Sequence, residues 1–179
     1  MGSRTVDLPT IHLHGTVVLG DEHEVGDAWV VGGRLTLERP SAAGLRGGET
    51  VRLDGVAVPG LVDVHCHVGL GPDGAVGRDE AEAQAVADRD SGVLLVRDAG
   101  SPADTRWIDD RDDLPRLLRA GHHLARPKRY LRGYGRELDE VTSLPRAAAQ
   151  EADRGDGWVK LVADWIDREV GDLTPLWPA

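Results

Sequence analysis

The sequence predicts an α/β protein in which a small all-β module is followed by alternating strands and helices. Residues 5–57 carry short strand-like runs separated by Gly and Asp. From residue 58 onward, strand-like runs alternate with helix-like runs, which is typical of βα units around a parallel sheet. We therefore expect two parts, an N-terminal β module over 1–57 and an α/β part over 58–179.

Length and composition exclude several classes of protein. With 179 residues the chain has the size of one ordinary domain and can bury a core. Its net charge of −10 argues against a nucleic-acid partner, because an acidic surface repels phosphate backbones. Cys66 is the one cysteine, so no internal disulfide is expected and a reducing compartment fits. Since residues 1–10 lack the apolar core of a secretory signal and no apolar run approaches about 18 residues, we expect a cytoplasmic protein with no membrane partner.

The β module is predicted from runs of apolar and β-branched residues. Gly32 and Gly33, which separate two of these runs, predict a hairpin. The close spacing of the runs suits a small all-β module. The predicted strands are Ile11–His14, Thr16–Leu19, Ala28–Val31, Arg34–Leu37 and Thr50–Leu53.

A His-x-His pair, His12 and His14, lies in the first of these strands. The flanking residues Ile11 and Leu13 give the ordinary alternation of a half-buried strand. No further ligand type lies near the pair in sequence. We therefore interpret these histidines as polar positions of the strand rather than as metal ligands.

The α/β part begins with a predicted strand over Val58–Val68. A helix follows over Asp79–Ala87, with acidic residues in its first turn that favour the helix dipole. Gly92 marks the end of this helix. Val93–Asp98 is then an apolar run that predicts a buried strand.

Two further units are predicted after the second strand. The chain becomes helical near Pro115–Ala120, and a weak third strand is expected around His122–Arg126. A third helix covers Ser143–Arg154, with a proline in its first turn. Trp158–Val162 is the fourth strand. The α/β part therefore contains four βα-type strands.

Asp63, His65 and His67 occupy every second position of the first of these strands. Side chains alternate between the faces of a strand, so the three share one face. Two imidazoles in this arrangement can bind one metal ion, and Asp63 lies one layer deeper, where it can accept a hydrogen bond. The alternative is a half-exposed strand whose polar face meets water.

Lys160 stands between Val159 and Leu161 in the fourth strand, so its side chain faces away from both. One interpretation is an edge-strand lysine that points into water. The other is an amine that faces the interior, becomes nucleophilic and captures carbon dioxide as a carbamate. A carbamate is an anion that can bridge two metal ions, which guanidinium cannot do. Lysine occurs only twice among the 21 basic residues, which favours a specific role for Lys160.

Three motifs together resemble the imidazolonepropionase-like and Xaa-Pro dipeptidase-like branch of the amidohydrolase superfamily. They are the Pro-Gly-x-x-Asp-x-His-x-His sequence over residues 59–67, Val-Arg-Asp-Ala-Gly over 96–100 and Trp-Val-Lys-Leu over 158–161. The likeness runs from about residue 15 to the end. It implies that residues 1–57 form half of a small β-sandwich and that 58–179 form strands one to four of a TIM-like (β/α)8 barrel, left incomplete.

The resemblance also implies a metal site. His65 and His67 are expected to bind a divalent ion, zinc above all, and N-carboxylated Lys160 to bridge it to a second ion. Two more histidines and the catalytic Asp come from later strands of the family. A closed barrel needs about 250 residues, so we expect these groups beyond residue 179 and no catalytic residue within the chain.

The implied chemistry is hydrolysis of a carbon–nitrogen, amide-type bond of a small-molecule substrate. Because the loops that set specificity follow the strands, half of them are missing and the substrate stays open. Three hypotheses remain: a truncated amidohydrolase that is inactive alone, one half of a split enzyme, or a non-catalytic interaction module. The partner would be a complementary barrel half or a second copy of the chain.

Some other polar residues are interpreted as structural. Asp98 is expected to pair with a neighbouring arginine rather than to bind metal. His122 and His123 are adjacent and so point to opposite faces; neither is assigned as a ligand. The basic loop over 127–137, with Tyr130 and Tyr134, is interpreted as solvated, the alternative being contact with a substrate carboxylate.

Overall fold

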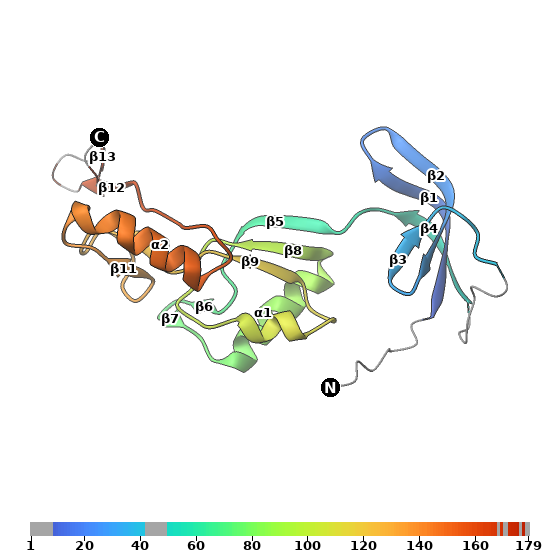
Figure 1. Cartoon of the computed structure of the whole chain (residues 1–179), viewed down its shortest axis with the longest axis horizontal. Helices are drawn as coiled ribbons and strands as arrows, with labels where there is room; N and C mark the ends of the chain where they lie inside the picture. The colour runs from blue at the N-terminus through green and yellow to red at the C-terminus, as the bar shows by residue number, and fades with distance from the viewer. Residues whose placement is uncertain (1–8, 42–49, 168, 170–171, 176, 178–179) are drawn as a thin grey trace. The chain divides into compact units, whose positions relative to one another are not determined.

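The computed structural model of the chain describes residues 9–41, 50–167, 169, 172–175 and 177 (Figure 1). The chain forms two compact units, Met1–Pro59 and Gly60–Ala179, and each is described by itself. Over the described residues the fold is mixed α/β, with many strands and few helices. In the described part of the chain, no helix is both long and apolar enough to cross a membrane.

The first unit contains a four-stranded sheet in the order β3-β2-β1-β4. Its antiparallel strands are β1 (Thr10–Gly20), β2 (His23–Val31) and β3 (Arg34–Thr36), while β4 (Thr50–Ala57) runs parallel to β1. Figure 1 shows these strands as the blue and teal arrows of this unit.

Glycines shape this sheet at two places. Gly15, with φ +119°, lies where the pairing with β2 shifts register, and a Cβ there would come within 2.2 Å of the Gly55 carbonyl oxygen. The two runs predicted on either side of Gly15 are consequently one irregular strand. Gly32 and Gly33 both have positive φ and join β2 to β3, which confirms the predicted hairpin.

The second unit is built on a parallel sheet in the order β5-β8-β9. Its strands are β5 (Leu61–Cys66), β8 (Val93–Asp98) and β9 (Arg116–Arg119). Helix α1 (Arg78–Asp90) lies against one face of this sheet (Figure 1). The apolar core between them includes these residues: Val68, Ala85, Val96, Ile108, Leu114 and Leu117. The predicted helix after the first strand and the predicted strand over Val93–Asp98 are confirmed.

The helix predicted near Pro115–Ala120 is wrong, because these residues form strand β9. Leu95 to Asp98 of β8 pair in parallel register with Arg116 to Arg119. The run is short and includes two arginines, and periodicity alone does not distinguish a short strand from a helical turn. Pairing with a buried neighbouring strand decides the outcome. A 3-10 helix, η1 (Arg106–Asp110), precedes β9 instead.

After β9 the chain forms a short parallel strand pair, a helix and a bridged segment. Strand β10 (His123–Ala125) pairs in parallel with β11 (Gly135–Glu137), and helix α2 (Leu144–Arg154) follows, close to the predicted span. Residues 158–162, the predicted fourth strand, form only isolated parallel bridges, Ala120 with Trp158 and Leu124 with Leu161. The remaining short elements are β6 (Leu70–Gly71), β7 (Gly74–Ala75), η2 (Val141–Ser143), β12 (Asp164–Asp167) and β13 (Asp172–Pro175).

Candidate functional site

His65 and His67 lie at the carboxyl end of β5. Their ring centroids are 5.3 Å apart, with the rings near perpendicular at 72°. Asp63 Oδ1 accepts a hydrogen bond of 2.9 Å from the backbone N–H of His65, which confirms that Asp63 acts as an acceptor beneath the histidines. Cys66, between them in sequence, packs against the apolar core on the α1 side instead. The alternation of the strand therefore separates the polar pair from the core.

Lys160 approaches this pair from the segment that follows α2. Two backbone hydrogen bonds hold this segment against Leu124. The Leu124 N–H donates to the Lys160 carbonyl oxygen at 2.8 Å, and the Val162 N–H donates to the Leu124 carbonyl oxygen at 2.9 Å. The Lys160 side chain is partly buried. Its positive charge is the largest cause of a lowered pKa at His65, ahead of desolvation and of the charge on His67. The charge of Lys160 therefore acts on the His65 ring.

The carbonyl oxygen of Gly100 fixes the orientation of two imidazoles. It accepts hydrogen bonds from His67 Nδ1 at 2.8 Å and from His123 Nε2 at 2.9 Å. A carbonyl can only accept, so both ring nitrogens must carry protons. In the neutral rings, His67 Nε2 and His123 Nδ1 are then left with free lone pairs, and a lone pair on a neutral imidazole is what a metal ion binds.

His123 joins the group although the sequence did not assign it. Its side chain is fully buried, and its ring lies 5.2 Å from that of His67. Burial, followed by the charge of His67, lowers the pKa of His123 to about 4, so the ring is neutral at physiological pH. Among the described residues, His123 Nδ1 is a buried polar atom without a hydrogen-bond partner.

The neighbouring histidine faces away from this group. Glu151 Oε2 accepts hydrogen bonds from the His122 backbone N–H at 2.8 Å and from its Nδ1 at 3.1 Å. The prediction that at most one of the two adjacent histidines could join a site is confirmed. The same alternation could have selected His123 from the sequence, had the register of β10 been known.

One tyrosine of the basic loop, Tyr130, lies beside an imidazole, and Tyr134 lies beside Tyr130. The Tyr130 ring lies 5.0 Å from that of His123 and 6.3 Å from that of Tyr134. Tyr134 donates its hydroxyl hydrogen to the Gly71 carbonyl oxygen, at 2.5 Å. Burial raises the pKa of Tyr130. The loop therefore presents aromatic surface to the site, while Lys128 is exposed.

Asp98 is structural, but the expected salt bridge to an arginine is wrong. Its two oxygens accept hydrogen bonds from backbone N–H groups, those of Gly100 at 2.8 Å and Val68 at 3.2 Å. The nearby Arg119 pairs with Asp109 and Asp156. Asp98 is 1% exposed, and burial raises its pKa to about 6.

Two of these imidazoles, those of His65 and His67, are donors of the kind that zinc binds. His67 Nε2 is freed by the Gly100 bond, and His65 is two residues away with its ring 5.3 Å from that of His67. Imidazole nitrogens are common zinc ligands, and a second hydrogen bond from the ligating ring is the usual way its orientation is fixed. His65 and His67 therefore offer two imidazole nitrogens to an ion, but among the described residues they are in no group of three His, Cys, Asp or Glu whose ligand atoms lie within 4.8 Å of one another.

Proteins of two mycobacteria are similar to this chain in sequence. No protein-family model matches the chain. Uncharacterised proteins of Mycobacterium tuberculosis (strain ATCC 25618 / H37Rv) and Mycobacterium bovis (strain ATCC BAA-935 / AF2122/97) are each 56% identical over 167 residues. The match covers 93% of this chain and 43% of each relative. The chain thus spans less than half the length of these relatives.

Solved structures give the fold. An amidohydrolase matches with a TM-score of 0.65 at 19% identity, over 87% of this chain and 47% of that protein. A Xaa-Pro dipeptidase with methionine bound in its active site matches with a TM-score of 0.59 at 17% identity, over 87% of this chain and 47% of the dipeptidase. The ochratoxinase of A. niger matches with a TM-score of 0.58 at 18% identity, over 89% of this chain and 48% of the ochratoxinase. The chain therefore has a partial amidohydrolase-like fold.

Proposed function

We propose that this chain is the N-terminal part of a metal-dependent amidohydrolase that hydrolyses carbon–nitrogen bonds, and that His65, His67 and Lys160 are its metal ligands. One observation carries the proposal: the Gly100 carbonyl holds His67 so that Nε2 is left with a free lone pair, two residues from His65, on which the charge of Lys160 acts. The amidohydrolase, peptidase and ochratoxinase neighbours support the same class of reaction.

The proposal includes a layout for each unit. The N-terminal sheet would be half of a β-sandwich, which fits the half-exposed side chains of Leu35 and Leu53 on β3 and β4. Strands β5 and β8, the interrupted strand made of β9 and β10, and the segment over 158–162 would be the first four strands of a (β/α)8 barrel. In such barrels the active site lies at the carboxyl ends of the strands, where His65 and His67 are found.

Each side chain then has a distinct task. When bound, the metal would lower the pKa of a coordinated water and polarise the substrate carbonyl. His65 and His67 would bind the ion through neutral ring nitrogens, and Gly100 would keep His67 oriented. As an ammonium, Lys160 repels a cation beside His65; as a carbamate it would supply an anionic ligand. Carboxylation of Lys160 therefore reverses the sign of the charge next to the imidazoles.

The chain alone is proposed to be inactive. The resemblance places the proton-transferring Asp and two further histidine ligands on later strands, outside residues 1–179. Without that carboxylate, no group would take the proton of the attacking water and return it to the leaving nitrogen. The proposed substrate is a small molecule with an amide-type bond.

Turnover assays test whether the chain alone is inactive. The purified chain is assayed with added zinc or manganese against dipeptides, hydantoin-like rings and lactams, and no turnover is expected. Metal-dependent turnover that disappears in His65→Ala would mean that the chain already holds a complete active site and that the base has been misplaced.

A second candidate is one half of a split enzyme or an interaction module. Among the described strands, β5 is at the edge of its sheet, and Leu61, Val62 and Val64 on it are each more than half exposed. An exposed apolar edge strand favours association with another chain. The coding sequence next to the gene discriminates: a continued frame with later histidine and Asp ligands supports the truncated enzyme, and a separate gene that encodes them supports the split enzyme.

A further inference from the structure

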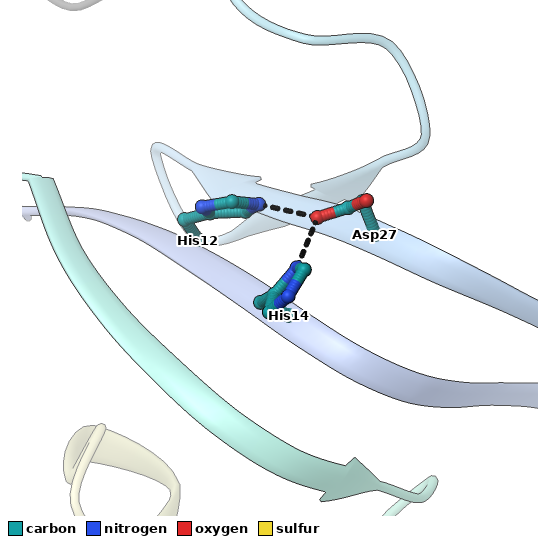
Figure 2. Close-up of side chains that lie close together, drawn as sticks. All are labelled: His12, His14 and Asp27. Atoms are coloured by element: carbon teal, nitrogen blue, oxygen red, sulfur yellow. Dashed lines mark hydrogen bonds and ion pairs between the residues drawn. The ribbon is translucent and has the colours of Figure 1, made fainter.

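A second group of metal-ligating side chains lies on the N-terminal sheet. It consists of His12 and His14 on β1 and Asp27 on β2 (Figure 2). The antiparallel register places His14 opposite Asp27 and His12 opposite Trp29. The hairpin therefore brings a third possible ligand, Asp27, to His12 and His14, although it is distant from them in sequence. His12 and His14 thus have the further ligand that their own strand lacks.

Both imidazoles converge on one carboxylate oxygen. Asp27 Oδ1 lies 2.7 Å from His12 Nε2 and 2.9 Å from His14 Nδ1, and Figure 2 shows the two rings directed at it from one side of the sheet. One ligand atom from each of the three residues can be chosen so that all lie within 4.8 Å of one another. No large rearrangement is needed to bring the three to one ion.

Neighbouring side chains hold this arrangement. The Trp29 ring stacks on that of His12, with centroids 4.9 Å apart and an angle of 2° between the planes. On the other side of β1, Arg52 and Asp54 stand opposite His12 and His14, and they form an ion pair with each other at 2.9 Å. The positive charge of Arg52 is thus paired with Asp54.

We propose that His12, His14 and Asp27 bind one divalent transition-metal ion of the zinc type, separately from His65 and His67. Two imidazole nitrogens and one carboxylate oxygen are a common zinc donor set, and a water would complete four-fold coordination. Zinc bonds of about 2.0–2.2 Å at tetrahedral angles separate neighbouring ligand atoms by about 3.3 Å. The two contacts to Asp27 therefore need to widen by only about half an ångström.

Binding exchanges protons for the ion. The ring protons that now point at Asp27 leave His12 Nε2 and His14 Nδ1, and each moves to the other ring nitrogen or to solvent. The carboxylate charge of Asp27 stays in place and offsets part of the charge of the ion. His14 and Asp27 are 43% and 44% exposed, so the ion can reach the site from solvent.

The test is to titrate the full chain with zinc and to measure binding by calorimetry and by histidine 1H–15N spectra. Zinc chloride should bind the wild type and shift the ring nitrogens of His12 and His14. Asp27→Asn keeps the size and one acceptor but removes the charge, and it should weaken this binding by about tenfold or more. His23→Ala, which removes an exposed histidine at the start of β2, is the matched control and should bind zinc as the wild type does.

Two outcomes would overturn the proposal. One is equal zinc affinity in the wild type and Asp27→Asn. The other, which does not require a folded variant, is a wild-type spectrum in which zinc leaves His12 and His14 unchanged. Because the spectra also report His65 and His67, failure of this site is distinguished from failure of the site proposed above.

Discussion

His67 and His123 donate hydrogen bonds to the same acceptor, the carbonyl oxygen of Gly100, at 2.8 and 2.9 Å. His67 directly follows β5 and His123 begins β10, 56 positions later in the sequence, and their rings are 5.2 Å apart. One backbone carbonyl therefore sets the proton position in both rings. The neutral tautomer of His67 that results has its free lone pair at Nε2.

Replacing Gly100 by Ala should destabilise the protein. Gly100 has φ +108°, and a Cβ there would lie 2.5 Å from the Gly121 carbonyl oxygen and 2.7 Å from His123 Cδ2. We expect the free energy of unfolding in urea to fall by roughly 2–3 kcal/mol. Gly26→Ala, where nothing lies within 4 Å of the added Cβ, should change it by less than about 0.5 kcal/mol. Equal stability of the two variants would contradict the described packing around Gly100.

Cys66 should react slowly with iodoacetamide in the folded protein. Burial, then the negative charge of Asp88, raises the pKa of the Cys66 thiol to about 11. At pH 8 only about one thiol in a thousand is then ionised, and the alkylation rate should rise about tenfold per pH unit between pH 7 and 9. Asp88→Asn should accelerate the reaction, and the urea-unfolded chain should react much faster than either folded form. A folded rate equal to the unfolded rate would contradict the burial of Cys66.

Asp98 should make the protein more stable as the pH falls below 7. Burial raises the pKa of Asp98 to about 6, above the unfolded value near 3.8, so the folded state binds this proton more tightly. The stabilisation is fully present below pH 3.8 and is lost as the pH rises through 6. Relative to Asp98→Asn, the free energy of unfolding of the wild type should rise by roughly 1 kcal/mol as the pH falls from 7 to 5. The same pH dependence in both proteins would show that Asp98 does not titrate in this range.

In a protein extended by the remaining barrel strands, Lys160→Arg should lose the bridged metal pair. Arginine keeps the charge and roughly the length of lysine, but a guanidinium does not form the carbamate. Lys160→Glu should partly restore metal binding, since it offers a shorter carboxylate. Metal content and hydrolase activity are measured with added bicarbonate. Full activity of Lys160→Arg would make Lys160 an ordinary strand lysine and would favour a mononuclear, deaminase-like site.

Sequence periodicity predicts the site strand well because its two faces differ in chemistry. In β5 the alternation of Asp63, His65 and His67 with apolar residues and Cys66 predicts which side chains share a face, and the hydrogen bond from His65 to Asp63 agrees. The strand over Val93–Asp98 is also predicted correctly, because its short length, its two valines and the glycines at positions 92 and 100 favour a strand over a helix.

The remaining features depend on contacts between distant segments. Pro115–Ala120 reads as helical until its pairing with β8 is known, and His123 cannot be separated from His122 without the register of β10. Asp27 joins His12 and His14 only because the hairpin aligns β1 with β2. Each of these outcomes is determined by strand register, which short-range patterns do not encode.

The most direct test of the proposed metal site is the histidine 1H–15N spectrum of the chain, recorded without and with zinc. Without zinc, His67 should show the Nδ1–H tautomer, because its Nδ1 donates to Gly100. With zinc, the ring nitrogens of His65 and the Nε2 resonance of His67 should shift, in addition to any change at His12 and His14. An Nε2–H tautomer at His67, or a spectrum in which saturating zinc leaves both His65 and His67 unchanged, would contradict the account.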